Sequence, residues 1–252
     1  MMYPILSVLI LFALWEAVCW LGAFPAFILP SPSSVIVSLW ELREFLFGNH
    51  LLVTLKEVLL GLLVSIIVGV MLAIVMRWNR PIEKIIYPYL VFSQTIPLVA
   101  LSPVFIMWFG YSLSGKIAIA TLFTFFPIVV SMYDGLGSAP KQMVDLLRTM
   151  GASRWQIFWK LQLPSSLPQF FSGLKVAATF SVTGATIGEW LGASEGLGYF
   201  GRRASGNFQA PALFASVLVL ALLGILLFCL VSYIEHLFVK KRKMAVHLRK
   251  EA

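Results

Sequence analysis

Charged residues are scarce in this chain of 252 residues: Asp, Glu, Lys and Arg make up only 12% of it, whereas 60% of the residues are hydrophobic. A soluble domain carries about 25% charged residues. A globular core of this length cannot bury so much apolar surface, so the composition excludes an ordinary soluble enzyme. The net charge of +8 would suggest a nucleic-acid partner in a soluble protein. No such partner is expected here, because the placement of the charges matters more than their sum.

Cysteine is also scarce, and the two cysteines, Cys19 and Cys229, both lie in apolar runs. This excludes a disulfide framework and favours buried thiols. Sequence patterns of the zinc proteases, of the serine hydrolase elbow and of Cys/His metal sites are absent. The G-x-x-x-x-G-K run over 110–116 is followed by Ile117, so it lacks the hydroxyl that holds magnesium in a P-loop. We therefore expect no catalytic residue, no metal site and no cofactor in this chain.

Long apolar segments account for most of the sequence. A helix needs about 20 apolar residues to cross a bilayer core, and backbone groups in hydrocarbon must bond within their own helix. The sequence thus predicts an all-α integral membrane protein with about six transmembrane helices, forming a single domain over residues 1–252. The third segment contains Pro88, Pro97 and Pro103, so we expect it to be broken. The segments are Ile5–Gly22, Val58–Met76, Ile85–Phe109, Ile117–Met132, Ser165–Leu191 and Ala212–Val239.

The basic residues indicate an orientation. If both termini are cytoplasmic, 13 of the 19 Lys and Arg residues fall on the cytoplasmic side and 5 on the opposite side, while Lys175 lies within a segment. Positively charged loops resist translocation. This bias favours cytoplasmic termini, including a basic tail over residues 240–252.

A helix is also expected between the first two segments. Ser33 or Ser34 can cap it, and apolar residues then recur with helical spacing. We expect this helix to lie on the outer surface of the membrane or of the helix bundle. The spaced residues are Val35, Leu39, Leu42 and Leu46.

Polar residues inside the apolar segments are candidates for a solute path. Ser93, Gln94 and Thr95 lie between two prolines of the broken segment, and Thr179 and Thr183 share a face of the fifth. The alternative for each hydroxyl is a bond to a carbonyl of its own helix. Two carboxylates, Glu16 and Glu189, are further candidates because burying a charge in the membrane is costly. Glu189 could instead reach water at the outer end of its helix.

Small residues recur at four-residue spacing in two stripes, Gly61, Ser65 and Gly69, and Gly184, Gly188, Gly192 and Gly196. Such stripes let membrane helices approach closely. They predict either static packing or a moving contact at a subunit interface or gate.

The connection between the fourth and fifth segments, about 135–164, is hydrophilic. A short amphipathic helix with Met143, Val144, Leu147 and Met150 exposed should end at Gly151. Ser153 and Gln156 then form a capping box for a second helix. This second helix should expose Trp155, Phe158 and Trp159. The loop is predicted to be a docking surface for a cytoplasmic protein, or alternatively a helix pair lying on the lipid.

Here the chain resembles the permease subunits of bacterial ABC importers, in the branch that carries nitrate, sulfonates, taurine and thiamine precursors. Their loop signature is E-A-A, three residues, Gly, nine residues, Ile, one residue and Leu-Pro. This chain keeps the spacing but has Asp-Leu-Leu in place of Glu-Ala-Ala. The matching residues are Asp145, Leu146, Leu147, Gly151, Leu161, Leu163 and Pro164, with further resemblance at 29–34, 96–110, 126–128 and 188–198.

The resemblance implies a MetI-like permease fold in the bacterial cytoplasmic membrane, acting as a homodimer. It also implies two cytoplasmic ATPase subunits, which carry ATP and magnesium, and an extracytoplasmic substrate-binding protein. The loop around Gly151 would contact the ATPase, so that ATP-driven closure moves the membrane helices. The implied coupling residues are Asp145, Leu146, Leu147, Gly151, Ala152, Arg154, Leu161 and Pro164, and the candidate path residues are Ser93, Gln94, Thr95, Thr179, Thr183 and Glu189.

Among possible solutes, a thiamine pyrimidine precursor such as a hydroxymethylpyrimidine or formylaminopyrimidine ranks first, and sulfonates, taurine or nitrate second. An ion-coupled secondary transporter is the alternative mechanism, but it would need midplane carboxylates or an inverted repeat. A membrane enzyme or scaffold is a third possibility, for which no constellation of acid, base or metal ligand is present.

Overall fold

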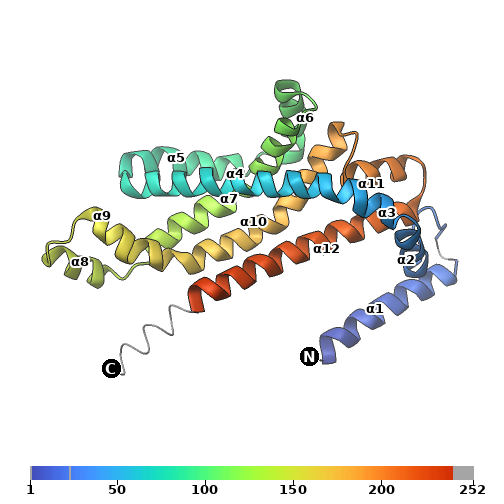
Figure 1. Cartoon of the computed structure of the whole chain (residues 1–252), viewed down its shortest axis with the longest axis horizontal. Helices are drawn as coiled ribbons and strands as arrows, with labels where there is room; N and C mark the ends of the chain where they lie inside the picture. Colours follow the sequence, from blue (N-terminus) through green and yellow to red (C-terminus); the bar gives the residue numbers. More distant parts are fainter. Residues whose placement is uncertain (1, 23, 241–252) are drawn as a thin grey trace. The chain divides into compact units, whose positions relative to one another are not determined.

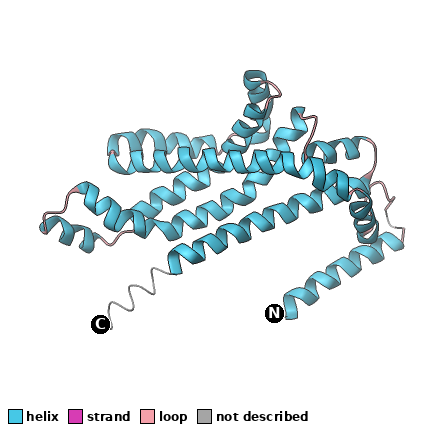
Figure 2. Ribbon diagram, in the orientation of Figure 1, coloured by secondary structure: helices cyan, strands magenta, loops and turns pink. Residues whose placement is uncertain are grey.

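The computed structural model describes residues 2–22 and 24–240, and the regular structure in this part is helical (Figures 1 and 2). Contacts divide the chain into two compact units, each built from two stretches of sequence. The first unit comprises Met1–Lys56 and Thr186–Leu223, and the second comprises Glu57–Ala185 and Gly224–Ala252. All but the first residue of the basic tail predicted over 240–252 lies outside the described residues.

The helices follow the expected apolar segments. In chain order the α-helices are α1 (Met2–Trp20), α2 (Pro32–Glu41), α3 (Arg43–Phe45), α4 (Leu51–Trp78), α5 (Arg80–Ser93), α6 (Leu98–Phe109), α7 (Leu113–Gly137), α8 (Lys141–Thr149), α9 (Arg154–Ile157), α10 (Leu163–Gly192), α11 (Leu197–Gly206) and α12 (Ala210–Glu235). Three π-helical turns lengthen neighbouring helices: η1 (Leu46–His50), η2 (Phe158–Gln162) and η3 (His236–Lys240).

Four helical stretches are long and apolar enough to cross a membrane: Arg43–Trp78, Leu113–Gly137, Arg154–Gly192 and Ala210–Val239. The pair α5 and α6 forms a fifth apolar unit that is bent by 103°. The apolar stretch of α1, Leu6–Trp20, is shorter. The all-α membrane fold is therefore confirmed, and so is the break in the third predicted segment. At the break, the backbone N–H groups of Gln94 and Thr95 donate hydrogen bonds to carbonyls of α5. Pro97, which has no N–H, precedes α6.

In the first unit, the helix predicted after the first segment packs against later parts of the chain. Val35 and Leu46 form a buried cluster with Leu197, Ala215 and Val219. The predicted cap at Ser33 or Ser34 is wrong, because Ser31 is the N-cap and accepts a bond from the Ser34 backbone N–H. Pro32 explains the shift: proline has no N–H to satisfy and is favoured at the first helical position.

In the second unit, α7 packs closely against both α4 and α10. A Cβ added at Gly61 of α4 would lie 2.6 Å from Ala120 Cβ, and one at Gly184 of α10 would lie 2.9 Å from Ala120 Cα. A Cβ at Gly69 would lie 2.9 Å from Ile128 Cγ2. Ser65, between the two glycines of α4, bonds to Thr124 of α7. The glycine stripes therefore include close packing contacts within one chain.

The second stripe is shorter than predicted. Helix α10 ends at Gly192, and Gly196 is the N-cap of α11. Gly196 has φ of +116°, a conformation that residues with a Cβ rarely adopt. It therefore belongs to a turn and not to a helix face.

Candidate functional site

The loop that resembles a coupling loop folds as two short helices, as predicted. Helix α8 ends at Thr149, and Gly151 follows with φ of +80°. The Gly151 N–H donates a hydrogen bond to the Arg148 carbonyl, and the Ala152 N–H donates one to the Leu147 carbonyl. This is the pattern that ends a helix at a glycine. A Cβ at Gly151 would meet nothing within 4 Å. The left-handed backbone thus requires glycine here, while the space around it is open.

The capping box of the second helix is confirmed. Ser153 Oγ accepts a hydrogen bond from the Gln156 backbone N–H at 3.2 Å, and Gln156 Oε1 accepts one from the Ser153 backbone N–H at 2.8 Å. Trp155 and Trp159 are exposed as expected. The prediction for Phe158 is wrong, because it is only 2% exposed and packs with Ala73 of α4 and with other core residues. η2, which continues α9, therefore packs against α4 through Phe158.

Three apolar side chains of α8 and its C-terminus are exposed in the described part of the chain: Met143 (55%), Leu146 (58%) and Met150 (73%). Val144 and Leu147 are half-buried. Asp145, which stands where the family signature has glutamate, pairs with Arg148 at 3.3 Å on the same exposed helix. An apolar face in this position is typical of an interaction surface.

The remaining coupling residues lie around the second helix. Arg154 is exposed, and Ala152, Leu161 and Pro164 are half-buried. Together with α8 they form one segment of the second unit, as their sequence spacing suggests.

Five of the six predicted path residues lie in the second unit, in two places. Ser93, Gln94 and Thr95 are at the bend between α5 and α6, and Gln94 and Thr95 are exposed there. Thr179 is half-buried and Thr183 exposed on α10. The hydroxyls of Ser93, Thr95 and Thr179 bond to backbone carbonyls of their own helices. Gln94 keeps a polar side chain directed outward at the bend, with one long contact of 3.5 Å to Ser93 Oγ.

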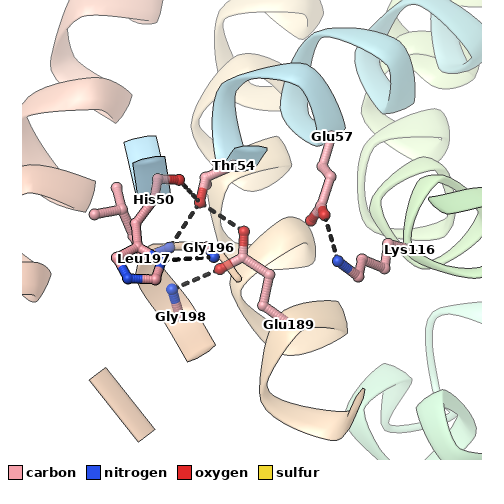
Figure 3. A network of polar contacts seen from close by, with 8 residues as sticks. All are labelled: His50, Thr54, Glu57, Lys116, Glu189, Gly196, Leu197 and Gly198. Atoms are coloured by element: carbon pink, nitrogen blue, oxygen red, sulfur yellow. Dashed lines mark hydrogen bonds and ion pairs between the residues drawn. The ribbon is translucent and has the colours of Figure 1, made fainter. Parts of the chain in front are cut away.

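Glu189, the sixth predicted path residue, lies in the first unit and is completely buried (Figure 3). Its Oε1 accepts a bond from Thr54 Oγ1 at 2.6 Å, and its Oε2 accepts one from the Gly198 N–H at 2.5 Å. The alternative that Glu189 reaches water is therefore wrong. The carboxylate lies at the N-terminus of α11, where the helix dipole favours negative charge.

Two residues of the N-terminal stretch complete this arrangement. Thr54 Oγ1 accepts a bond from the Leu197 N–H at 2.9 Å, and His50 Nδ1 accepts one from the Gly196 N–H at 3.0 Å (Figure 3). The first N–H groups of α11, which have no partner within the helix, are thus bound by side chains of three separate residues. We call His50, Thr54 and Glu189 the α11 clamp. The sequence analysis missed His50 and Thr54, because nothing local links them to a turn about 140 residues away.

Glu16, the other predicted carboxylate, has a similar role in α1. Its Oε2 accepts a hydrogen bond from the Ser33 backbone N–H at 3.0 Å. Its Oε1 accepts hydrogen bonds from Ser33 Oγ at 2.7 Å and from Trp20 Nε1 at 3.1 Å. Glu16 thereby ties the N-terminal turn of α2 to α1.

Two ion pairs also lie within apolar helices of the second unit. Lys116 Nζ is 2.7 Å from Oε1 of the fully buried Glu57 (Figure 3), and Lys175 Nζ is 2.9 Å from Glu235 Oε2. The sequence patterns do not link Lys116 to Glu57. The only indication in the sequence that Glu57 needs a partner is its position in an apolar helix. No group of three or more potential metal ligands occurs among the described residues.

The family model described as "Binding-protein-dependent transport system inner membrane component" matches residues 65–243. The chain is 45% identical to the formylaminopyrimidine transport permease protein ThiX of Halalkalibacterium halodurans, over 95% of this chain and 96% of that protein. It is 34% identical to the riboflavin transport system permease protein RibX of Chloroflexus aurantiacus, over 93% and 88% of the two chains. The aliphatic sulfonates permease SsuC of Bacillus subtilis, named as putative, is 28% identical over 92% and 85%.

Among solved structures, the chain is similar to one titled "Inward facing conformations of the MetNI methionine ABC transporter". The TM-score is 0.61 at 21% identity, covering 81% of this chain and 95% of that one. This likeness confirms the fold.

Proposed function

Because the chain belongs to the family of binding-protein-dependent transport system inner membrane components, and is thus an ABC importer permease, we propose that it carries a thiamine pyrimidine precursor of the formylaminopyrimidine type into the cytoplasm. The observation that carries this proposal is the 45% identity to a formylaminopyrimidine permease over nearly the full length of both chains. A sulfonate, taurine or nitrate solute is the second candidate, supported by the 28% identity to the SsuC sulfonates permease.

ATP hydrolysis is assigned to a separate partner chain. The proposed assembly contains two copies of this chain, two cytoplasmic ATPase subunits that bind ATP and magnesium, and an extracytoplasmic binding protein. Both termini are placed in the cytoplasm on the distribution of basic residues. The exposed apolar side chains of α8 support its role as the ATPase contact, because a protein partner would bury them.

The open space at Gly151 provides the test of this contact. Replacing Gly151 with Trp adds a bulky group at a position where a Cβ would meet no other atom within 4 Å in the described part of the chain. Gly110, in another loop, is the control: its φ is +66°, and a Cβ there would also meet nothing within 4 Å. Its ψ of −167° lies in a region that is essentially restricted to glycine, so Gly110→Trp is itself a strained variant. If Gly110→Trp retains function, strain at a glycine position does not by itself explain a loss at Gly151.

We expect Gly151→Trp to lose ATPase binding and ATP-driven uptake in proteoliposomes, while Gly110→Trp retains both. Equal thermal stability of the two variants would show that the loss is not one of folding. Normal ATP-driven uptake by Gly151→Trp would contradict the assignment of the loop.

The solute is tested with the complete transporter reconstituted with its binding protein. Formylaminopyrimidine should stimulate ATP hydrolysis and accumulate inside the vesicles, and taurine should do neither. Stimulation by taurine alone would favour the second candidate. Uptake by this chain alone under an ion gradient would favour a secondary transporter.

The path is assigned to Gln94 and to the face of α10 that carries Thr179 and Thr183. Cysteines placed at these positions should react with water-soluble thiol reagents in at least one nucleotide state. Resistance in every state would remove these residues from the path.

A further inference from the structure

A cleft of about 700 Å³ lies in the second unit, where the end of α4 and the start of α5 meet α8 and α9. Four of the ten residues that line it are arginines. Arginines come from all four elements, and Glu83 is the one acidic residue in the lining. Glu83 already accepts a hydrogen bond from the Tyr133 hydroxyl. The lining arginines are Arg77, Arg80, Arg148 and Arg154.

Most of this positive charge is available to a ligand. Arg80 and Arg154 are exposed and form no ion pair within the described part of the chain. Arg148 is paired with Asp145 at 3.3 Å, but both side chains are about two-thirds exposed, and such surface pairs contribute little. Arg77 contacts an aromatic ring. One guanidinium group can donate two parallel hydrogen bonds to the oxygens of a phosphate, so a cluster of arginines fits a phosphate group.

An apolar stripe on α4 leads to the same cleft. Its residues are spaced by four or three positions, so they share one helix face, and each is 43 to 62% exposed. The last of them, Trp78, lines the cleft together with Trp155, with ring centroids 5.4 Å apart. Tryptophan is favoured where apolar membrane meets water. The stripe consists of Leu63, Ile67, Met71, Val75 and Trp78.

We propose that this arginine cleft binds the phosphate headgroup of an anionic phospholipid, with the acyl chains along the α4 stripe. Basic pockets at the ends of membrane helices recognise acidic headgroups by charge and hydrogen bonding. A free anion or an acidic peptide would use the arginines but would leave the stripe uncovered. The proposal does not depend on the identity of the solute, but Arg148 and Arg154 also belong to the loop that is proposed to contact the ATPase.

The test is native mass spectrometry of the full-length chain after incubation with equimolar phosphatidylglycerol and phosphatidylcholine. The wild type should retain phosphatidylglycerol preferentially. The double variant Arg80→Gln/Arg154→Gln should lower that preference by about tenfold or more, because it removes two of the four guanidinium groups that would bind the phosphate. The matched control Arg202→Gln/Arg203→Gln removes two exposed arginines of α11 and should retain the wild-type preference.

Equal retention of the two lipids by the wild type, or an equal loss in both double variants, would overturn the proposal. So would binding of inorganic phosphate with the same arginine dependence in the absence of phosphatidylglycerol retention. If the ATPase partner displaced the bound lipid one for one, the arginines would bind acidic residues of that partner and not a lipid, which would also overturn the proposal.

Discussion

At the scale of single residues, two carboxylates in apolar helices have structural partners that explain their burial or position. Glu189 binds Thr54 and the start of α11, and Glu16 binds the start of α2. Both lie at helix N-termini, where unpaired N–H groups and the helix dipole stabilise a negative charge. A charge in an apolar segment is therefore not by itself evidence of a solute path.

We predict that Glu189→Gln lowers the thermal stability of the purified chain. Both carboxylate oxygens accept hydrogen bonds, whereas a glutamine amide has one acceptor oxygen and would direct an NH₂ group at a donor. The expected cost is about 1–3 kcal/mol in free energy of unfolding. Glu41→Gln is the control, because it removes a charge from an exposed position of the same unit, outside the α11 clamp. Equal melting temperatures for the two variants would show that the clamp does not stabilise the fold.

At the scale of helices, glycine contacts set the distance of α7 from α4 and α10. An alanine normally stabilises a helix by about 1 kcal/mol relative to glycine. At Gly61 we expect alanine to destabilise the protein, because the added Cβ would lie 2.6 Å from Ala120 Cβ. Gly61→Ala should therefore lower the melting temperature. Gly224→Ala should not, since its nearest neighbour would be Val182 at 4.0 Å. A stabilised Gly61→Ala variant would contradict the close packing.

A second prediction at this scale concerns the ion pair between α4 and α7. Lys116→Met would leave the fully buried Glu57 without its cation, which typically costs about 3–5 kcal/mol. The double variant Glu57→Met/Lys116→Met removes both charges and should recover much of that stability. Thermal unfolding of the wild type, both single variants and the double variant measures the coupling. Additive effects of the two substitutions would show that the pair has no net interaction.

At the scale of the whole molecule, the orientation in the membrane follows from charge. Single cysteines at Gly151 and Gly110, in a Cys19→Ser/Cys229→Ser background, should face opposite sides. A membrane-impermeant thiol reagent should label Gly151→Cys in inverted vesicles and Gly110→Cys in right-side-out vesicles, because the loops richer in Lys and Arg remain in the cytoplasm. The reverse labelling would place both termini outside.

The sequence by itself determined the class of fold, the break near Pro97 and the two short helices α8 and α9. These features depend on local properties: the length of apolar runs, the missing N–H of proline, the capping box at Ser153 and the glycine that ends α8. The family resemblance also followed from residue spacing alone, and the comparisons confirm it.

Only the tertiary structure decided which buried polar groups meet. The α11 clamp joins His50 and Thr54 to a turn near Gly196, and Lys116 meets Glu57 across 59 positions. It also placed Phe158 in the core and ended the second glycine stripe before Gly196. Such contacts depend on how helices pack in space, and in an apolar chain a buried charge shows that a partner is needed without showing where in the sequence that partner lies.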